Sequence, residues 1–144
     1  MDIEMVFTRV SLVLIAATVL ACSSDKITQS EPPVLFEGEI TITNDAGVTI
    51  RLVEFTQRRG SEEYNGELNL TVYSGNRYTL WNELDGGDTH IFPGGDHVWL
   101  TFVAAVPTPG DPDVPLFENN VTLTVNGSAV IVVKTGGEYS IGDE

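Results

Sequence analysis

The chain has 144 residues, of which 21 are Asp or Glu and 7 are Lys or Arg, and its formal net charge is −14. This acidic balance argues against nucleic-acid binding, which needs basic side chains to replace phosphate counterions, and against electrostatic docking on anionic lipid. An apolar content of 42% is typical of a globular protein, and the length suits one domain with one core. A solvated acidic surface explains the charge more simply than a cation-binding role does.

The first apolar segment covers residues 10–21 and carries no charge over its 12 residues. It is too short for a membrane-spanning helix, which needs about 20 residues, and it fits the hydrophobic region of a secretory signal peptide. The segment runs into Val-Leu-Ala-Cys at residues 19–22, which resembles the bacterial lipobox. The resemblance implies that residues 1–21 are a signal peptide cleaved after Ala21, and that Cys22 receives a lipid.

A lipid on Cys22 would anchor the protein to a membrane. Cys22 is the single cysteine of the chain, so it cannot form an internal disulfide. Several acyl chains, such as palmitate, give stable anchoring where one chain would be marginal. Ser23, directly after the cysteine, is compatible with delivery to the outer membrane of a diderm bacterium. The sequence therefore predicts a lipoprotein of the cell envelope, with this covalent lipid and no other cofactor.

The residues on either side of the apolar segment refine this prediction. Asp2 and Glu4 outweigh Arg9 in a region that is normally positive, and a start at Met5 would remove both acids. We therefore expect Met5 to be the initiator. Residues 22–34 are polar and end in prolines, which is typical of a flexible tether.

From Leu35 onward, short segments rich in Val, Ile, Leu, Thr, Phe and Tyr alternate with Gly, Asn, Asp and Pro. This pattern is typical of short antiparallel strands in a sandwich or barrel. We therefore predict that residues 35–144 form a single all-β domain, an antiparallel β-sandwich of about 7–8 strands. The expected strands are residues 36–43, 47–55, 67–73, 77–82, 89–92, 97–106, 116–125 and 128–134.

An Asn-Gly pair at residues 126–127 gives the clearest turn signal. It favours a two-residue type I′ turn, because both residues tolerate positive φ. The resulting hairpin would pair Leu123 with Val130 and direct both toward the core. Thr122 and Thr124 would then face outward.

Residues 91–102 combine an aliphatic residue, Pro-Gly, a polar step and an alternating strand. This arrangement resembles bacterial immunoglobulin-like domains and implies an immunoglobulin-like sandwich. A transthyretin-like or carboxypeptidase-regulatory-like sandwich and an open barrel remain alternatives. Residues 107–115 hold four prolines, which exclude a central strand and predict a stiff connection that crosses from one sheet to the other.

Both histidines of the chain lie close together in the sequence, among acidic residues. If Pro93–Asp96 is a tight turn, His90 and His97 are diagonal neighbours on one sheet face, with Cα atoms about 7–8 Å apart. A zinc ion could then be held between them. The candidate ligands are Asp88, His90, Asp96 and His97. Ordinary turn chemistry is the simpler explanation for the same residues.

Calcium is a second possible metal. Asp85 and Asp88 form one acidic loop, and Asp111 and Asp113 form another. Calcium takes six to eight oxygen ligands, often from several loops at one end of a sandwich. Neither loop matches the EF-hand pattern. The Asp and His loops at residues 85–97 nevertheless leave a zinc- or calcium-binding envelope domain as the alternative function.

Motifs of catalysis are absent from the sequence. It contains no Gly-x-Ser-x-Gly, no P-loop and no His-Glu-x-x-His. Glu62 and Glu63 are adjacent in a loop, whereas a glycosidase needs its two acids across a cleft. We therefore predict a protein without catalytic activity, and a small hydrolase is the least favoured alternative.

Two aromatic residues, Tyr73 and Trp81, are candidates for an exposed contact. If they are exposed together, they could stack on a sugar or grip a protein partner. A role in the core or at a sheet edge is the more common one for such residues. The sequence thus predicts a lipid-anchored binding or structural module of the cell envelope, whose partner is an unidentified protein or glycan.

Overall fold

The structure, a computed structural model, describes residues 30–143. The chain divides into two units, residues 1–33 and residues 34–144. The second unit contains all the strands of the described residues. The predicted signal peptide, Cys22 and most of the predicted tether lie outside the described residues.

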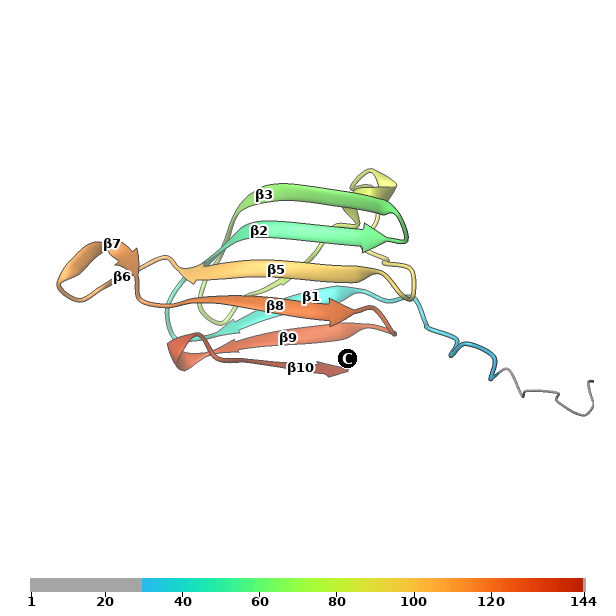
Figure 1. Cartoon of the computed structure of the whole chain (residues 1–144). Helices are drawn as coiled ribbons and strands as arrows, with labels where there is room; N and C mark the ends of the chain where they lie inside the picture. The colour runs from blue at the N-terminus through green and yellow to red at the C-terminus, as the bar shows by residue number, and fades with distance from the viewer. Residues whose placement is uncertain (1–29, 144) are drawn as a thin grey trace, which may run out of the picture. The chain divides into compact units, whose positions relative to one another are not determined.

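The second unit is a sandwich of two four-stranded sheets (Figure 1). Sheet A consists of β10 (Tyr139–Asp143), β9 (Ala129–Lys134), β1 (Ile40–Asp45) and β4 (Arg77–Thr79), in that order. Sheet B consists of β3 (Glu62–Val72), β2 (Ile50–Arg59), β5 (His97–Ala104) and β8 (Glu118–Thr124), in that order. The predicted all-β sandwich is confirmed, with eight strands in its two sheets.

Three smaller elements complete the fold. A two-stranded ribbon, β6 (Pro107–Thr108) and β7 (Asp111–Pro115), extends from sheet B. Two short 3-10 helices, η1 (Glu83–Asp85) and η2 (Thr135–Gly137), lie in connections. Strands β1 and β9 are parallel, whereas the other pairs in the two sheets are antiparallel.

Strand β5 shows how the sequence builds the core. Val98, Leu100 and Phe102 are at most 2% exposed and point between the sheets. Trp99 and Thr101, which alternate with them, lie half-buried on the outer face of sheet B. Full burial of one large apolar side chain contributes about 1.5–3 kcal/mol, so this alternation fixes which face of β5 turns inward.

A bulge in β2 places both Leu52 and Phe55 on the inner face of the strand. The register of β2 against both neighbours shifts between Leu52 and Glu54. Leu52 and Phe55 are both buried although they are three residues apart. One extra residue, Val53, is thus inserted at the bulge, and the strand continues with its apolar residues inside.

The hairpin predicted at residues 126–127 is wrong. Strand β8 pairs with β5 in sheet B, whereas β9 pairs with β1 and β10 in sheet A. Gly127 has a φ of 87°, but no residue other than glycine has a positive φ in the described chain, so the two positive angles of a type I′ turn are not met. The outward positions of Thr122 and Thr124 are confirmed.

The turn between β8 and β9 instead holds the segment that precedes β1. The Gly127 amide donates to the Phe36 carbonyl over 2.7 Å, and the Phe36 amide donates to the Asn126 side chain over 3.2 Å. Gly38 is paired with Phe92 in an isolated bridge. The segment is therefore fixed between two loops at one end of the sandwich.

Two further strand predictions need correction. Residues 89–92 form no strand beyond the bridge at Phe92, because η1 and its flanking turns use this part of the chain to cross between sheets. Residues 107–115 do not cross between sheets either. They form the β6–β7 tip of a long hairpin whose arms, β5 and β8, belong to the same sheet. Prolines are tolerated there because neither strand is central in a sheet.

Candidate functional site

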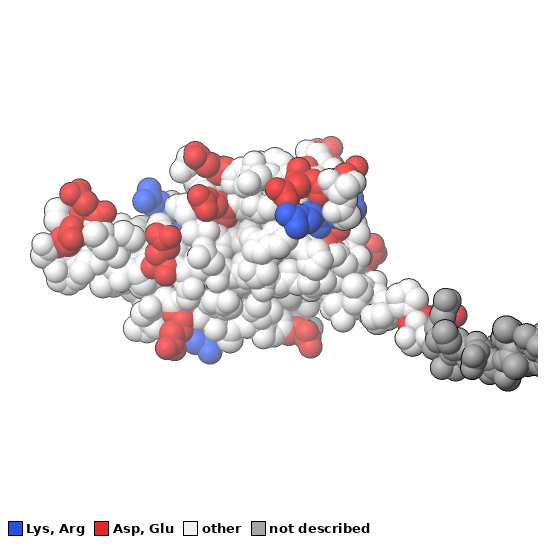
Figure 2. Space-filling view, in the orientation of Figure 1, with Lys and Arg blue, Asp and Glu red and all other residues white. Residues whose placement is uncertain are grey.

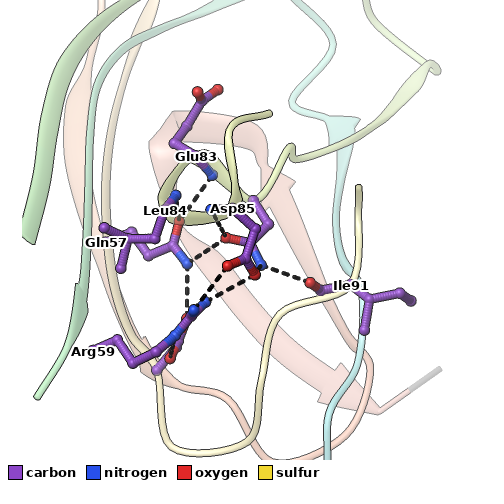
Figure 3. Close-up of polar contacts among 8 residues, drawn as sticks. Gln57, Arg59, Glu83, Leu84, Asp85 and Ile91 are labelled. Atoms are coloured by element: carbon purple, nitrogen blue, oxygen red, sulfur yellow. Dashed lines mark hydrogen bonds and ion pairs between the residues drawn. The ribbon is translucent and has the colours of Figure 1, made fainter. Parts of the chain in front are cut away.

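A buried polar cluster joins the loop around η1 to strand β2 (Figure 3). Gln57, Asn82 and Asp96 are at most 1% exposed. The Gln57 amide nitrogen donates to Asn82 over 2.8 Å and to Asp96 over 2.7 Å. Its amide oxygen accepts from the backbone amides of Glu83 and Leu84 at 3.0 and 3.2 Å, so Gln57 uses both ends of its side chain.

Arg59 supplies the positive charge of this cluster. Its guanidinium donates to both oxygens of Asp96 at 2.9 and 3.0 Å, and to both oxygens of Asp85 at 2.9 and 3.2 Å. These hydrogen bonds raise the pKa of Arg59 and keep the group charged. Hydrogen bonds from Arg59 also lower the pKa of the Asp85 carboxyl below its ordinary value. Charge-assisted bidentate pairs of this kind are the strong ones in proteins.

Asn82 ties the cluster to the η1 loop. Asn82 caps η1 by accepting from the Asp85 amide and also donates to the Ile91 carbonyl over 2.8 Å. In the part of the chain that the structure describes, no buried side-chain nitrogen or oxygen lacks a hydrogen-bond partner. The buried groups of the cluster are thus all engaged, and their hydrogen bonds hold the η1 loop on sheet B.

The four residues suggested as zinc ligands lie in different surroundings. Asp96 is bound to Arg59 and Gln57, and Asp88 is exposed. The His90 ring lies 3.6 Å from the Trp81 ring, centroid to centroid, and its Nδ1 is 2.9 Å from the Leu80 carbonyl oxygen. The described residues contain no group of three or more His, Cys, Asp or Glu side chains that could hold a metal ion.

The geometry proposed for the two histidines is wrong. His97 pairs with Arg58 of β2 on one side and with Thr124 of β8 on the other, so Phe92 is not its partner. A turn does form at Pro93–Asp96, with the Asp96 amide 3.2 Å from the Pro93 carbonyl oxygen. This turn leads the chain into sheet B and does not close a local hairpin, which separates His90 from His97.

The two acidic loops considered for calcium lie at opposite ends of the domain. Asp85 belongs to η1, whereas Asp111 and Asp113 belong to the β6–β7 ribbon, which projects from the other end (Figure 1). Asp85 is paired with Arg59. The two loops cannot therefore contribute ligands to one calcium ion.

The two aromatic residues suggested as a contact pair are both exposed. Tyr73 is 63% exposed and Trp81 is 39% exposed. Tyr73 precedes β4 and Trp81 follows it, so they lie beyond opposite ends of that strand. Tyr73 and Trp81 therefore do not lie side by side on one face of β4.

Another aromatic residue lies on the outer face of sheet B. Trp99 stands between Thr56 and Thr122 in the strand register. The Arg58 guanidinium carbon is 5.2 Å from the centre of its ring. Val98 and Leu100, which flank Trp99 in the alternating pattern of β5, are buried, and this alternation is the sequence signal that Trp99 points outward.

A groove lies on the outer face of the described domain. It has a volume of about 420 Å³ and lies between the outer face of sheet B and the tip hairpin, residues 105–116. Arg51, Glu54, Thr101 and Glu118 line it from the sheet. The hairpin contributes Val106, Pro112 and Asp113, among others. The groove was missed from the sequence because it depends on how the proline-rich segment folds back.

The groove carries more negative than positive charge. Glu54, Asp113 and Glu118 line it together with one cation, Arg51. None of these four side chains forms an ion pair with another residue of the described range 30–143. Figure 2 shows acidic side chains gathered over the projecting hairpin. The groove thus offers three exposed carboxylates against one cation, Arg51, and none of the three is in an ion pair in the described chain.

Comparison with known proteins gives no family. No family model matches the chain, and no curated protein matches it. Among solved structures, the chain is similar to the human-specific toxin intermedilysin, with 14% identity over 75% of this chain and a TM-score of 0.45. It is also similar to a disulfide-locked intermedilysin mutant with human CD59, with 13% identity over 76% of this chain and a TM-score of 0.47.

The match covers only part of the toxin. The chain spans 23% and 24% of the length of those two toxin chains.

Among the described residues, no helix combines the length and the apolar character that crossing a membrane requires.

Proposed function

We propose that the chain is a non-catalytic binding module, held on the cell envelope by a lipid on Cys22. The lipobox-like residues 19–22, directly after an apolar segment of signal-peptide length, support the anchor. The groove beneath the tip hairpin supports the binding role, because concave surfaces with both apolar and polar walls are the usual ligand sites.

The observation that carries the proposal is the position of the groove relative to the start of the domain. Phe36 is held by Asn126 and Gly127, which follow the end of β8. The groove lies at the other end of the same hairpin, where β5 runs into residues 105–116. Along β5 the distance between the two ends is about 23 Å. The chain therefore enters the domain, at Phe36, at the end opposite the groove.

Binding is proposed in preference to catalysis because of what the polar residues already do. Asp96 and Asp85 are committed to Arg59, and Asn82 to the cap of η1. The acids of the groove are exposed and have no histidine beside them among its lining residues. General acid–base work usually needs a positioned group whose pKa is tuned by its surroundings.

The lipid anchor is tested by replacing its acceptor. The unaltered protein and the C22A variant are expressed in a diderm bacterium that is fed an alkyne-labelled fatty acid, and the cells are then fractionated. We expect label and membrane partition for the unaltered protein, and loss of both for C22A, because the thioether carries the lipid. Label on C22A at the same level as on the unaltered protein would overturn the proposal.

A further inference from the structure

We propose that the groove beneath the tip hairpin binds an extended basic peptide segment, in which Lys or Arg residues alternate with apolar residues. This inference deepens the proposed function and rests on it: it names the class of partner that the module would carry. It is drawn from the walls of the groove, the exposed apolar side chains of the hairpin and the charges that line it.

The walls of the groove are of two kinds. One wall is the outer face of sheet B, where Val53 and Val103 stand among polar residues. The other wall is the tip hairpin, with Val106, Pro107 and Pro112. The volume of about 420 Å³ is within the range of ligand sites, and both walls offer apolar and charged contacts to a chain segment that carries both kinds of side chain.

The hairpin also exposes large apolar side chains. Val106, Val114 and Leu116 are 37%, 47% and 44% exposed. Of the three, Val106 lines the groove, and Leu116 is its neighbour on the hairpin, since the Leu116 amide donates to the Val106 carbonyl over 2.9 Å. Clustered exposed apolar side chains with a polar rim are typical of protein interaction sites. The partner therefore needs apolar side chains of its own.

The charge of the groove selects the sign of the partner. Glu54, Asp113 and Glu118 face a single cation, Arg51, and none of them has a counter-ion in the range 30–143. A bound anion would meet an excess of carboxylates, whereas Lys or Arg side chains would gain partners there. Complementary charge raises association rates and suppresses wrong partners. The favoured partner is therefore basic.

A peptide in an extended conformation can present both apolar and basic side chains to the groove. In an extended peptide, successive side chains point to opposite sides, so alternation puts apolar residues on one face and basic residues on the other. Valines and carboxylates stand on both walls, so the apolar face of the peptide can contact the valines of the groove while its basic side chains reach the carboxylates. Pro112 and Pro115 have no amide hydrogen to donate, so recognition relies on side chains and less on strand pairing along β7.

The test is a binding assay with the full chain, purified in detergent micelles. The probe is a fluorescein-labelled ten-residue peptide of alternating Lys and Val, followed by fluorescence anisotropy. Two matched peptides replace Lys by Glu, or Val by Ser. We expect the Lys/Val peptide to bind at least tenfold more tightly than either matched peptide. Equal affinity for the Lys/Val and Lys/Ser peptides, or no binding of the Lys/Val peptide, would overturn the inference.

Two variants with the same change of charge locate the site. The groove variant is E54Q/D113N/E118Q, and the control is E37Q/E62Q/D143N, whose acids are exposed outside the groove. We expect the groove variant to bind the Lys/Val peptide about tenfold more weakly, since it loses three charge partners, and the control to change affinity less than twofold. Equal losses in the two variants would contradict a site in the groove.

An apolar variant checks the second half of the inference. V106S/L116S should weaken binding of the Lys/Val peptide and leave binding of the Lys/Ser peptide unchanged. Both side chains are already exposed, so the fold should tolerate the change. The assay involves no membrane, whereas the labelling of Cys22 does not involve the groove. A negative result in the peptide assay therefore does not affect the labelling of Cys22, and a negative labelling result does not affect the peptide assay.

Discussion

At the scale of single residues, the polar cluster around Arg59 engages the carboxylate of Asp96, one of the four candidate zinc ligands. Asp96 is 1% exposed, and an ionised carboxylate at such a position needs a close cationic partner. Arg59 is that partner, although the two residues are 37 positions apart. The sequence singled out Asp96 through its neighbours His90 and His97. It could not show Arg59, because the contact depends on how β2 and the loop before β5 are placed.

The pairing of Asp85 with Arg59 predicts a dependence of stability on pH. The pKa of Asp85 is lowered in the folded state, so its contribution is fully present above the pKa of an unfolded Asp, about 3.9, and is lost as the pH falls through the lower folded value. Because the Asp85 side chain is 42% exposed, we expect less than about 1 kcal/mol.

Urea unfolding of the unaltered protein and of D85N, measured between pH 2 and pH 7, checks this prediction. The unaltered protein should be the more stable near neutral pH, and the difference should shrink toward the acid end. E62Q, which removes an exposed acid without an ion pair in the described chain, is the control. A difference between D85N and the unaltered protein that grows toward acid pH would contradict the assignment.

The separate engagement of the histidines and acids predicts no response to metals. We expect the thermal midpoint of the purified protein to stay the same with calcium, zinc or EDTA, because no described group supplies three ligands together. A ligand that binds only the folded state adds about 2.7 kcal/mol at a hundred times its Kd, which a melt detects easily. A rise that EDTA reverses would restore the metal-binding alternative.

At the scale of the elements, alternation in the sequence predicted the strands well, but not their partners. Residues 97–106 were expected as a strand, and β5 covers most of them with its apolar residues inside. The Asn-Gly turn was a strong local signal for pairing residues 116–125 with 128–134. It failed because β8 completes sheet B and β9 completes sheet A, and these pairings involve residues far away in sequence.

The charged ends of β2 and β3 were missed for a different reason. The two strands continue to Arg59 and from Glu62, where the residues are polar and suggest a loop. There the strands are held by cross-strand pairs, such as Arg58 with Glu63, whose side chains are 2.6 Å apart. Polar alternation on an exposed hairpin carries little hydrophobic signal, so sequence patterns underestimate its length.

Gly38 gives a sharp test of how the segment before β1 is held. A Cβ atom at Gly38 would lie 2.1 Å from the backbone of Gly127, so any larger residue forces two backbone segments apart. We expect Gly38→Ala to lower the free energy of unfolding by at least about 2 kcal/mol. Gly142→Ala is the matched control, because nothing lies within 4 Å of a Cβ there.

Urea unfolding with both variants measures the effect of this contact. The control should stay within about 0.5 kcal/mol of the unaltered protein, as surface substitutions usually do. If Gly38→Ala were as stable as Gly142→Ala, the close approach of the two backbones would be wrong.

At the scale of the whole molecule, the features of the β domain fall into two groups. The chain enters the sandwich beside the β8–β9 turn, and the buried cluster around Arg59 fixes the η1 loop near that end (Figure 1). The other end carries the tip hairpin, the groove and a set of exposed carboxylates (Figure 2). The sequence predicted the proline-rich segment as a connection, and its folding into a projecting hairpin is what forms the groove.

The proposed function joins this arrangement to the N-terminal sequence. A short polar tether between a lipid and the domain would keep the domain close to a membrane, while its acidic surface, with 19 acidic and 6 basic residues from Cys22 onward, keeps it from anionic lipid. A basic peptide partner would meet the groove at the end of the domain opposite Phe36. The proposed location at the cell envelope depends on the lipid on Cys22.

Intact-mass spectrometry of the mature protein, purified from the membrane fraction of a diderm bacterium, tests that part most directly. The account predicts a chain that begins at Cys22 and carries the added mass of a diacylglyceryl group and an amide-linked acyl chain. A mature chain that begins at another residue, or one that begins at Cys22 without added mass, would contradict it.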